Sequence, residues 1–527
     1  MFSTRVGSLS VAIITSFIVI LGRIIYWQFY TPTNLRRQET SQNYSDHQID
    51  ENQGKIYYKD HSLLAGNKRV YKLSLYKPNL DKPIEDVRLI LEKEITNLLP
   101  QDKIRLRSIV EKPNLKWVDF ETEITKEQYQ KISTIAGLEF KSKTSRYYPE
   151  SDLSQNLFFG IESYYRRQLQ GKPGYFYSNQ DALGLPVLTQ HSLYIEPVDG
   201  LDLSTSIDRR IQYLTETTIA DGINKYSADS GMAIVLDPQS GAVLSLVSLE
   251  SSPSANQNSK LIDPISHLFE PGSIFKPLVV AAALDSNSIS DDYVCPKCDQ
   301  PFIASGFSIN NWDKSFHPNT DIKDIIKNSD NIGMSNIVFV LGQKQFLKYF
   351  NLLGLDKKTG IDLPSENISP VKSYWSDIDL ATASFGQGLA VTPIQMIQAF
   401  NSLANSGKIV HPHINLNNPI KPPIKVYSEN TVEKINQILS YAVNNGVVSQ
   451  FKPKDLDVCA KSGTAQVAIN GQYSDNSFIA SYIGYSPCRH PKFTLLITLS
   501  NPKSSSWGSS TAAPLWFSLA EKIDKLL

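Results

Sequence analysis

Phe269-Glu-Pro-Gly-Ser-Ile-Phe-Lys-Pro-Leu-Val-Val280 joins a Pro-Gly turn to a run of residues that favour a helix. Ser273 and Lys276 are three residues apart, so a helix that begins here places both side chains on one face. The N–H groups at a helix N-terminus lack partners and can stabilise a developing oxyanion. A partly desolvated lysine can lose its proton and act as a base. The segment therefore predicts a nucleophilic serine, Ser273, with Lys276 as its base.

The Ser-x-x-Lys spacing alone is weak evidence, because it also occurs at Ser74/Lys77, Ser369/Lys372 and Ser449/Lys452. Around Ser74 the residues alternate as in a strand, which directs side chains three apart to opposite faces. A proline follows directly after Ser369 and after Lys452. Of these four pairs, the one at Ser273 is the one that a Pro-Gly turn precedes and an apolar helix follows.

A second element follows the amphipathic helical pattern of Asp321 to Lys327, at Asn328-Ser-Asp-Asn331. A turn here can present the Ser329 hydroxyl for proton transfer and the Asn331 amide for binding a substrate peptide. The later copy Ser474-Asp-Asn476 lies between two apolar segments, and we interpret it as a turn, since these residue types favour turns.

A third element is Lys461-Ser-Gly-Thr464, in an apolar segment that the strand pattern of 477–484 can pair with. Small residues at a sheet edge allow an extended substrate to bind as an extra strand. We expect Lys461 to supply positive charge and Ser462, Gly463 and Thr464 to line the substrate. The Thr464 backbone N–H is a candidate second oxyanion donor. The earlier Lys358-Thr-Gly360 lies in a predicted loop and is not preferred.

Apolar strand patterns stand at both ends of the C-terminal half, at 231–236, 242–247, 477–484 and 493–499. The first two are joined by a turn-rich connection at 237–241. Helical patterns dominate 268–403, and an amphipathic helix is predicted at 515–526. This order predicts an α+β unit with one antiparallel sheet, whose strands come from opposite ends of the unit and are flanked by helices.

The three elements in this order are the marks of penicillin-binding proteins. The segment from Ser230 to the C-terminus resembles their transpeptidase domain. Further resemblance lies in Ser384-Phe-Gly-Gln-Gly-Leu-Ala-Val-Thr-Pro-Ile-Gln-Met396 and in 359–366. Upstream, 160–162, 169–171 and 200–208 resemble the pedestal of class B members. Two departures are a degenerate first pedestal motif, with Lys59-Asp60, and Ser462 where threonine is commoner.

The resemblance implies a peptidoglycan D,D-transpeptidase, closer to the septal, cell-division subtype than to the elongation subtype. Lys276 would deprotonate Ser273, which attacks the penultimate D-alanine carbonyl of a stem peptide. The N–H groups of Ser273 and Thr464 would hold the oxyanion, Ser329 would pass a proton to the leaving D-alanine, and an amine of a neighbouring stem would accept the acyl group. β-Lactams would trap the same serine.

The resemblance also implies partners: peptidoglycan stem peptides, lipid-linked precursor strands, a polytopic glycosyltransferase and other cell-wall machinery. No cofactor is expected. Three rival functions share features of this sequence. A carboxypeptidase or β-lactamase would transfer the acyl group to water. A penicillin sensor would signal after acylation. A non-enzymatic division scaffold would recruit partners and would tolerate the loss of Ser273.

The N-terminal run 6–21 carries no charge, and 24–27 extends it towards the ~20 residues that cross a bilayer. We predict five parts: a cytoplasmic tail (1–5), a transmembrane anchor (6–27), a polar tether (28–52), an elongated α+β pedestal without a deep core (53–206) and a transpeptidase domain (207–527). The count of basic residues does not orient the anchor. The extracytoplasmic substrate implies a single-pass membrane protein with most of its chain outside.

Composition excludes some classes of function. Lysine plus arginine equals aspartate plus glutamate at 52 each, which gives no electrostatic reason to expect nucleic acid. None of the eight histidines forms an H-E-x-x-H motif, and no metal is expected. Cys295-Pro-Lys-Cys298 is a redox pair, half of a zinc site or a local disulfide; a zinc site would also need Cys459 and Cys488. A loop clip or two free thiols is the favoured interpretation.

Overall fold

The computed structural model describes residues 2–29, 44–150, 153, 155–180, 186–187, 193–251, 263–469 and 472–527. Most of the predicted tether, 30–43, lies outside these residues. The chain divides into two compact units. The first comprises Met1–Gly54, Asn67–Arg146 and Gln170–Leu201, and the second comprises Lys55–Gly66, Tyr147–Leu169 and Asp202–Leu527.

Helix α1 (Phe2–Phe29) contains the segment predicted as an anchor. Within the described ranges, no helix combines the length and apolar character that a membrane crossing needs. The structure thus supports the α+β class but does not show the predicted transmembrane helix.

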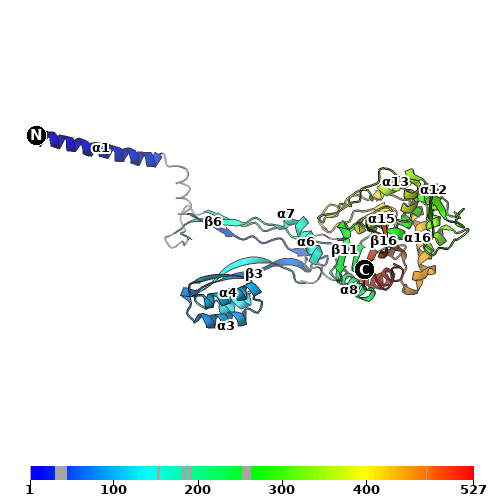
Figure 1. The fold of residues 1–527 in the computed structure, drawn as a ribbon, viewed down its shortest axis with the longest axis horizontal. Coiled ribbons are helices and arrows are strands. Elements are labelled where there is room, and N and C mark those ends of the chain that lie inside the picture. Colours follow the sequence, from blue (N-terminus) through cyan, green and yellow to red (C-terminus); the bar gives the residue numbers. More distant parts are fainter. Residues whose placement is uncertain are drawn as a thin grey trace. The chain divides into compact units, whose positions relative to one another are not determined.

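Two sheets lie in the first unit (Figure 1). In one, β6 (Gly174–Gln180) pairs antiparallel with β1 (Tyr44–Ile49), β7 (Pro186–Val187) and β8 (Leu193–Ile195). In the other, β3 (Leu63–Tyr76) pairs with β4 (Trp117–Ile124) and β5 (Leu138–Tyr147). The remaining elements are η1 (Lys77–Asn79), α3 (Ile84–Glu94), α4 (Pro100–Glu111) and α5 (Lys126–Ile132).

The first unit has a core of its own, so the expectation of a pedestal without a deep core is wrong. Leu75, Val87, Leu91, Leu106 and Ile109 are fully buried in one cluster between the strands and the helices. Helix periodicity and strand alternation each contribute one apolar face, and these faces bury each other. Short runs of charged residues in the sequence obscure this pattern.

The second unit is built on one five-stranded sheet, in the order β11-β10-β18-β17-β16, with all neighbours antiparallel. The prediction of strands from opposite ends is confirmed, because β10 pairs with β18. The strands are β10 (Ser230–Leu236), β11 (Val243–Glu250), β16 (Cys459–Ile469), β17 (Gln472–Ser486) and β18 (Phe493–Ser500). β2 (Ile56–Tyr57) pairs with β9 (Leu203–Ser204) and, at Leu63 and Ala65, with the start of β3. Two short antiparallel pairs join β12 (Phe302–Ala304) with β13 (Phe307–Ile309) and β14 (Lys408–Ile409) with β15 (Ile424–Lys425).

Side-chain caps mark the start of several helices. Asp208 accepts from two N–H groups of α8, and Thr392 forms a capping box with Gln395 at α15. The helices of this unit are α6 (Gln155–Tyr164), α7 (Arg166–Leu169), α8 (Arg209–Tyr226), α9 (Asp263–Ser266), η2 (Gly272–Phe275), α10 (Lys276–Asp285), α11 (Ile322–Lys327), α12 (Asn331–Leu341), α13 (Gln343–Leu352), α14 (Asp377–Ala383), α15 (Pro393–Ala404), α16 (Glu429–Asn445), η3 (Val447–Phe451) and α17 (Ala512–Asp524).

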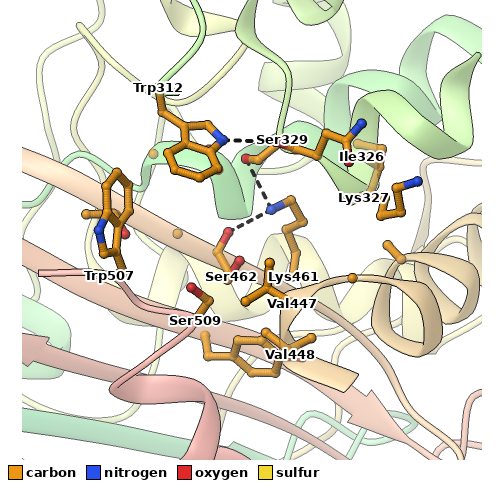
Figure 2. A pocket seen from close by; sticks show the side chains of 18 of the residues that line it. Trp312, Ile326, Lys327, Ser329, Val447, Val448, Lys461, Ser462, Trp507 and Ser509 are labelled. Carbon is orange, nitrogen blue, oxygen red and sulfur yellow. Dashed lines mark hydrogen bonds between the residues drawn. The ribbon is translucent and has the colours of Figure 1, made fainter. Parts of the chain in front are cut away.

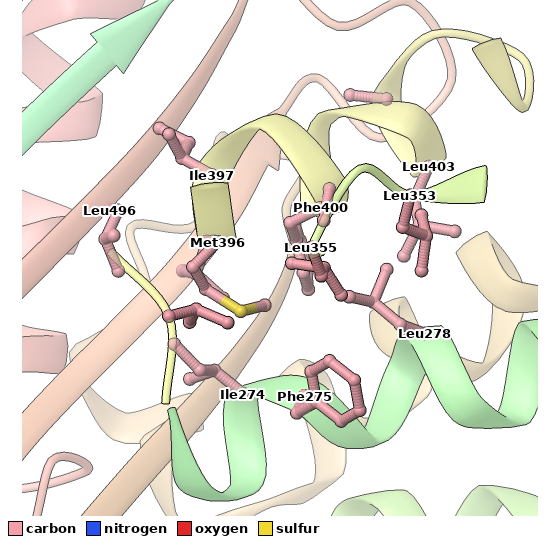
Figure 3. Packing of buried hydrophobic residues seen from close by; sticks show 14 of the residues in the cluster. Ile274, Phe275, Leu278, Leu353, Leu355, Met396, Ile397, Phe400, Leu403 and Leu496 are labelled. Carbon is pink, nitrogen blue, oxygen red and sulfur yellow. The ribbon is translucent and has the colours of Figure 1, made fainter. Parts of the chain in front are cut away.

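Apolar side chains cover both faces of this sheet. α8 and α17 pack on one face, where Trp516 and Phe517 are buried against Tyr482. The other face packs on α15 and the helices beyond it. Figure 3 shows Ile274 and Phe275, next to the predicted nucleophile, packed towards Met396 of α15. The start of α10 is therefore buried in the core of the second unit.

Candidate active site

The predicted nucleophile, Ser273, lies in the short 3-10 helix η2, which runs directly into helix α10 at Lys276. Gly272 has φ +59°, and a Cβ there would lie 3.2 Å from the Thr464 carbonyl oxygen. Its N–H donates to the Gly386 carbonyl at 2.9 Å. A glycine is required because the backbone is left-handed and strand β16 approaches it closely. Ser273 is thus held directly beside the edge of the sheet.

Lys276 is completely buried, and its amine donates to the second motif. Its Nζ lies 2.6 Å from the Ser329 carbonyl oxygen, 3.1 Å from Ser329 Oγ and 2.8 Å from Asn331 Oδ1. Burial lowers the pKa of Lys276 well below its usual value, and the nearby Lys461 lowers it further against the opposing effect of Asp330. Burial therefore favours the form of Lys276 that can accept a proton.

The second motif forms the entry to helix α12. Ser329 has φ +56°, a left-handed conformation that is uncommon for a residue with a side chain. Asp330 caps the helix by accepting from the Gly333 N–H at 2.7 Å. Capping places Ser329 before the helix and Asn331 in its first turn, so both side chains face the Lys276 amine.

The third motif lies on β16, an edge strand. Lys461 is paired in register with Ile483 of β17, and only 4% of its surface is exposed. Its Nζ donates to Ser329 Oγ at 3.2 Å and to the Ser462 carbonyl oxygen at 2.9 Å, as Figure 2 shows. Burial lowers the pKa of Lys461 to about 7. Two lysine amines therefore share one serine hydroxyl.

A cleft of about 820 Å³ opens above these residues. Trp312 and Trp507 line it with their rings edge to face, 4.9 Å apart between centroids, and both are about half exposed. The Thr464 hydroxyl accepts from the Gly508 N–H at 3.0 Å, which fixes the segment carrying Trp507 to the β16 edge. The cleft is lined by three motifs from three separate parts of the chain.

All eight predicted site residues meet here. Seven line the cleft, and Lys276 lies beneath it, bonded to two of them. The lining set is Ser273, Ser329, Asn331, Lys461, Ser462, Gly463 and Thr464. The structure thus brings the predicted residues together, while the chemical role of each stays a prediction.

The motif copies that were set aside lie elsewhere. Lys358-Thr-Gly360 is in a loop, where Glu366 accepts from the Thr359 N–H and hydroxyl at 2.6 Å. Ser474-Asp-Asn476, interpreted as a turn, lies instead within strand β17. There the pairing with β16 is irregular, which turn-favouring residues tolerate.

Both cysteine pairs form disulfides, Cys295 with Cys298 and Cys459 with Cys488. The local clip at 295–298 agrees with the favoured interpretation, and the zinc alternative is wrong because each pair is closed on itself. Among the described residues, no group of histidine, cysteine and carboxylate side chains is arranged to hold a metal ion. The second disulfide ties the start of β16, two residues before Lys461, to the segment after β17.

Sequence reasoning missed several residues around the second motif. Asn311 and His317 hydrogen-bond to it, and Trp312 donates its indole N–H to the Asn328 carbonyl at 3.1 Å. These residues belong to an irregular segment after the β12–β13 hairpin. A single sequence gives such a segment no periodicity, so no signal marked it.

Comparison with known proteins identifies the family. Residues 231–521 match the model of the penicillin binding protein transpeptidase domain, and residues 49–158 match that of the penicillin-binding protein dimerisation domain. The first match spans more than half of the chain. The chain therefore belongs to the penicillin-binding proteins, in the class B group that joins these two domains.

Individual relatives agree with this assignment. Stage V sporulation protein D of Bacillus subtilis is 27% identical, over 95% of this chain and 82% of that protein. The peptidoglycan D,D-transpeptidase FtsI of Escherichia coli is 26% identical, over 98% and 90%. The crystal structure of penicillin binding protein 2X from Streptococcus thermophilus superposes with a TM-score of 0.76 at 19% identity, over 92% and 80%, which shows a shared fold.

Proposed function

We propose that this chain cross-links peptidoglycan as a D,D-transpeptidase, through an acyl-enzyme on Ser273. The carrying observation is the pair of buried amines, Lys276 and Lys461, that share the Ser329 hydroxyl beside that serine. Membership of the family and the FtsI relatives support the reaction type.

The lowered pKa of Lys276 favours the form that can act as a base. Neutral Lys276 takes the proton of Ser273, whose oxygen attacks the carbonyl of a D-Ala-D-Ala stem. The N–H groups of Ser273 and Thr464 hold the oxyanion, because β16 and the start of α10 lie side by side. Ser329 connects Lys276 to the leaving D-alanine nitrogen as a proton path. Lys461, charged below pH 7, attracts the substrate carboxylate.

The substrate lies along β16. That strand is paired on one side only, and its Ser-Gly-Thr run leaves room for an added extended peptide. Asn331 Oδ1 accepts from Lys276 and Asn331 Nδ2 donates to the Asn310 carbonyl at 3.3 Å, so one Asn331 amide hydrogen remains to donate to the stem peptide. Small residues on the strand and a carboxylate-binding lysine fit a D-alanyl-terminated peptide better than a bulky or cationic one.

Finer assignments belong to the same proposal. The role is septal rather than in elongation, which the FtsI relatives support. Residues 6–27 anchor the chain once in the cell membrane, 28–52 tether it, 53–206 form the pedestal and 207–527 the transpeptidase domain outside the cell. The membrane-embedded partner is a polytopic glycosyltransferase that supplies lipid-linked strands. The uncharged run before residue 22 supports the anchor.

Intact-protein mass after exposure to a penicillin tests the reaction. We expect a single stable adduct in the wild type and none in Ser273→Ala. Rapid hydrolysis of the penicillin would indicate that the chain is a hydrolase and not a transferase. A folded wild type without an adduct would exclude the acyl-enzyme and favour a scaffold.

A further inference from the structure

The second motif is held by two residues that lie outside all three motifs. Asn311 and His317 come from the irregular segment between hairpin β12–β13 and helix α11. Both contact Asp330, the middle residue of Ser329-Asp-Asn331, and Asp330 is 1% exposed. A buried carboxylate must be fully hydrogen-bonded, so these contacts decide whether this turn is stable.

Each oxygen of Asp330 has a partner. Oδ1 accepts from the Gly333 N–H at 2.7 Å. Oδ2 accepts from Asn311 Nδ2 at 3.0 Å and from His317 Nδ1 at 2.7 Å. Because a carboxylate only accepts, His317 carries its proton on Nδ1. Removing the imidazole would leave a buried oxygen with one weaker donor.

Asn311 also caps the helix that carries Asn331. Its Oδ1 accepts from the N–H groups of Asn331, at 2.8 Å, and Ile332, at 3.2 Å. These are N–H groups that the first turn of α12 cannot pair internally. Asn311 and Asp330 together satisfy three successive N–H groups, which fixes where α12 begins.

Ser329 depends on this fixed start. Its left-handed backbone, φ +56°, persists only where the surroundings determine it. Both oxygen atoms of Ser329 accept from Lys276 Nζ, and its hydroxyl also accepts from Lys461 Nζ. A shift of this turn would therefore displace the acceptors of both amines.

The segment that carries His317 is itself secured. The His317 N–H donates to the Cys298 carbonyl and the Cys295 N–H donates to the Thr320 carbonyl, both at 2.9 Å. The disulfide loop is therefore hydrogen-bonded to both ends of residues 317–320. His317 is held through its backbone N–H as well as through its imidazole ring.

We propose that His317 and Asn311 are positioning residues for acylation: through Asp330 they hold Ser329 and Asn331 where Lys276 and Lys461 can use them. This inference rests on the proposed acyl-transfer function. The alternative is that the same contacts only stabilise the fold, with no influence on the reaction of folded molecules.

The experiment compares His317→Ala with His317→Asn in the full chain. The asparagine Nδ2 takes nearly the place of the imidazole Nδ1, so it can restore the bond to Asp330. The exposed His490 supplies a matched control, His490→Ala. For each variant, the second-order rate of acylation by a fluorescent penicillin is measured, scaled to the molecules that form an adduct at completion, beside the melting temperature.

We expect His317→Ala to lower the acylation rate by about 10- to 100-fold, since misplacement by about 1 Å costs this much. His317→Asn should stay within about threefold of wild type, as should His490→Ala. Asn311→Ala should slow acylation to a similar extent as His317→Ala, and it tests the inference independently where His317→Ala does not fold.

Two results would overturn this inference and leave the proposed function standing. One is a wild-type acylation rate in His317→Ala and Asn311→Ala with a lowered melting temperature, which would make the contacts purely structural. The other is equal loss in His317→Ala and His317→Asn, which would show that the hydrogen bond to Asp330 is not the cause. Absence of an adduct in the wild type would instead overturn the proposed function, and this inference with it.

Discussion

A buried carboxylate in the first unit favours its charged form, whereas two buried lysines in the second unit favour the neutral form. In the first unit, Asp102 is completely buried, and its carboxylate accepts from the N–H groups of Glu121 and Thr122 and from the Thr122 hydroxyl. Burial alone raises the pKa of Asp102, but these hydrogen bonds and Arg105 outweigh it and leave the pKa lowered. In the second unit, Lys276 and Lys461 are also buried, yet their pKa values are lowered towards the neutral form.

The carboxylate of Asp102 stabilises the fold, whereas the amines of Lys276 and Lys461 are placed to react. Asp102 is ionised and ties α4 to β4, which is a structural task. Among the residues that the structure describes, the two lysines have only neutral acceptors within hydrogen-bonding distance, and burial therefore favours loss of their protons. A site that keeps cations unstable at neutral pH costs stability and is expected where a base is needed.

Replacing Lys276 should give the largest effect on the reaction. Lys276→Met removes the base while keeping most of the buried volume, and we expect acylation by a penicillin to fall at least about 1,000-fold. The melting temperature should change by only a few degrees, because a destabilised buried amine is lost together with its hydrogen bonds. Stopped-flow acylation and thermal unfolding measure the two quantities. If acylation is unchanged in Lys276→Met, another group must act as the base.

Replacing Lys461 should have a smaller effect with a distinct pH dependence. We expect Lys461→Met to slow acylation by about 100-fold, as for loss of one electrostatic contact to the reacting substrate. In the wild type, acylation should decline as the pH rises above about 7, where Lys461 loses its charge. This alkaline decline should be absent from the variant. A decline that persists in Lys461→Met would assign it to a different group.

Asp102→Asn should lower stability and leave acylation unchanged, the opposite of what is expected for Lys276→Met. The amide presents one acceptor where the carboxylate has two, so the backbone N–H groups of Glu121 and Thr122 lose part of their pairing. We expect the free energy of unfolding of the first unit to fall by about 2 kcal/mol. The acylation rate should remain within about twofold of wild type, since the sites are independent. Denaturant unfolding and penicillin acylation check this, and slowed acylation would reveal coupling between the units.

The stability of the second unit should depend on pH through its two buried lysines. Both lysines have pKa values in the folded chain below the unfolded value of about 10.4, so the unfolded state binds more protons between about pH 7 and pH 10. Stability should therefore rise with pH across this range. The slope should become smaller in the double variant Lys276→Met/Lys461→Met. Thermal unfolding at several pH values tests this, and equal slopes would contradict the lowered pKa values.

Prediction from sequence succeeded where local pattern and chemistry coincide. The strands β10, β11, β17 and β18 follow apolar runs, and the Pro-Gly turn before Ser273 does precede a helix. It failed where distant segments complement each other. The core of the first unit was missed because its apolar faces are interrupted by charges, as in α3 and α4, and are joined only on folding.

The order of the three motifs, the sheet that carries the third and the family they indicate can all be read from the amino-acid sequence. The three-dimensional fold was needed to show that Lys461 and Lys276 meet at one hydroxyl and that Cys459 pairs with Cys488. It was also needed to show that Asn311 and His317 contact the turn at Ser329. Secondary structure is encoded in residues a few positions apart, whose spacing a sequence displays directly. Contacts between segments far apart in the chain depend on how whole elements pack, and the spacing of residues carries no record of them.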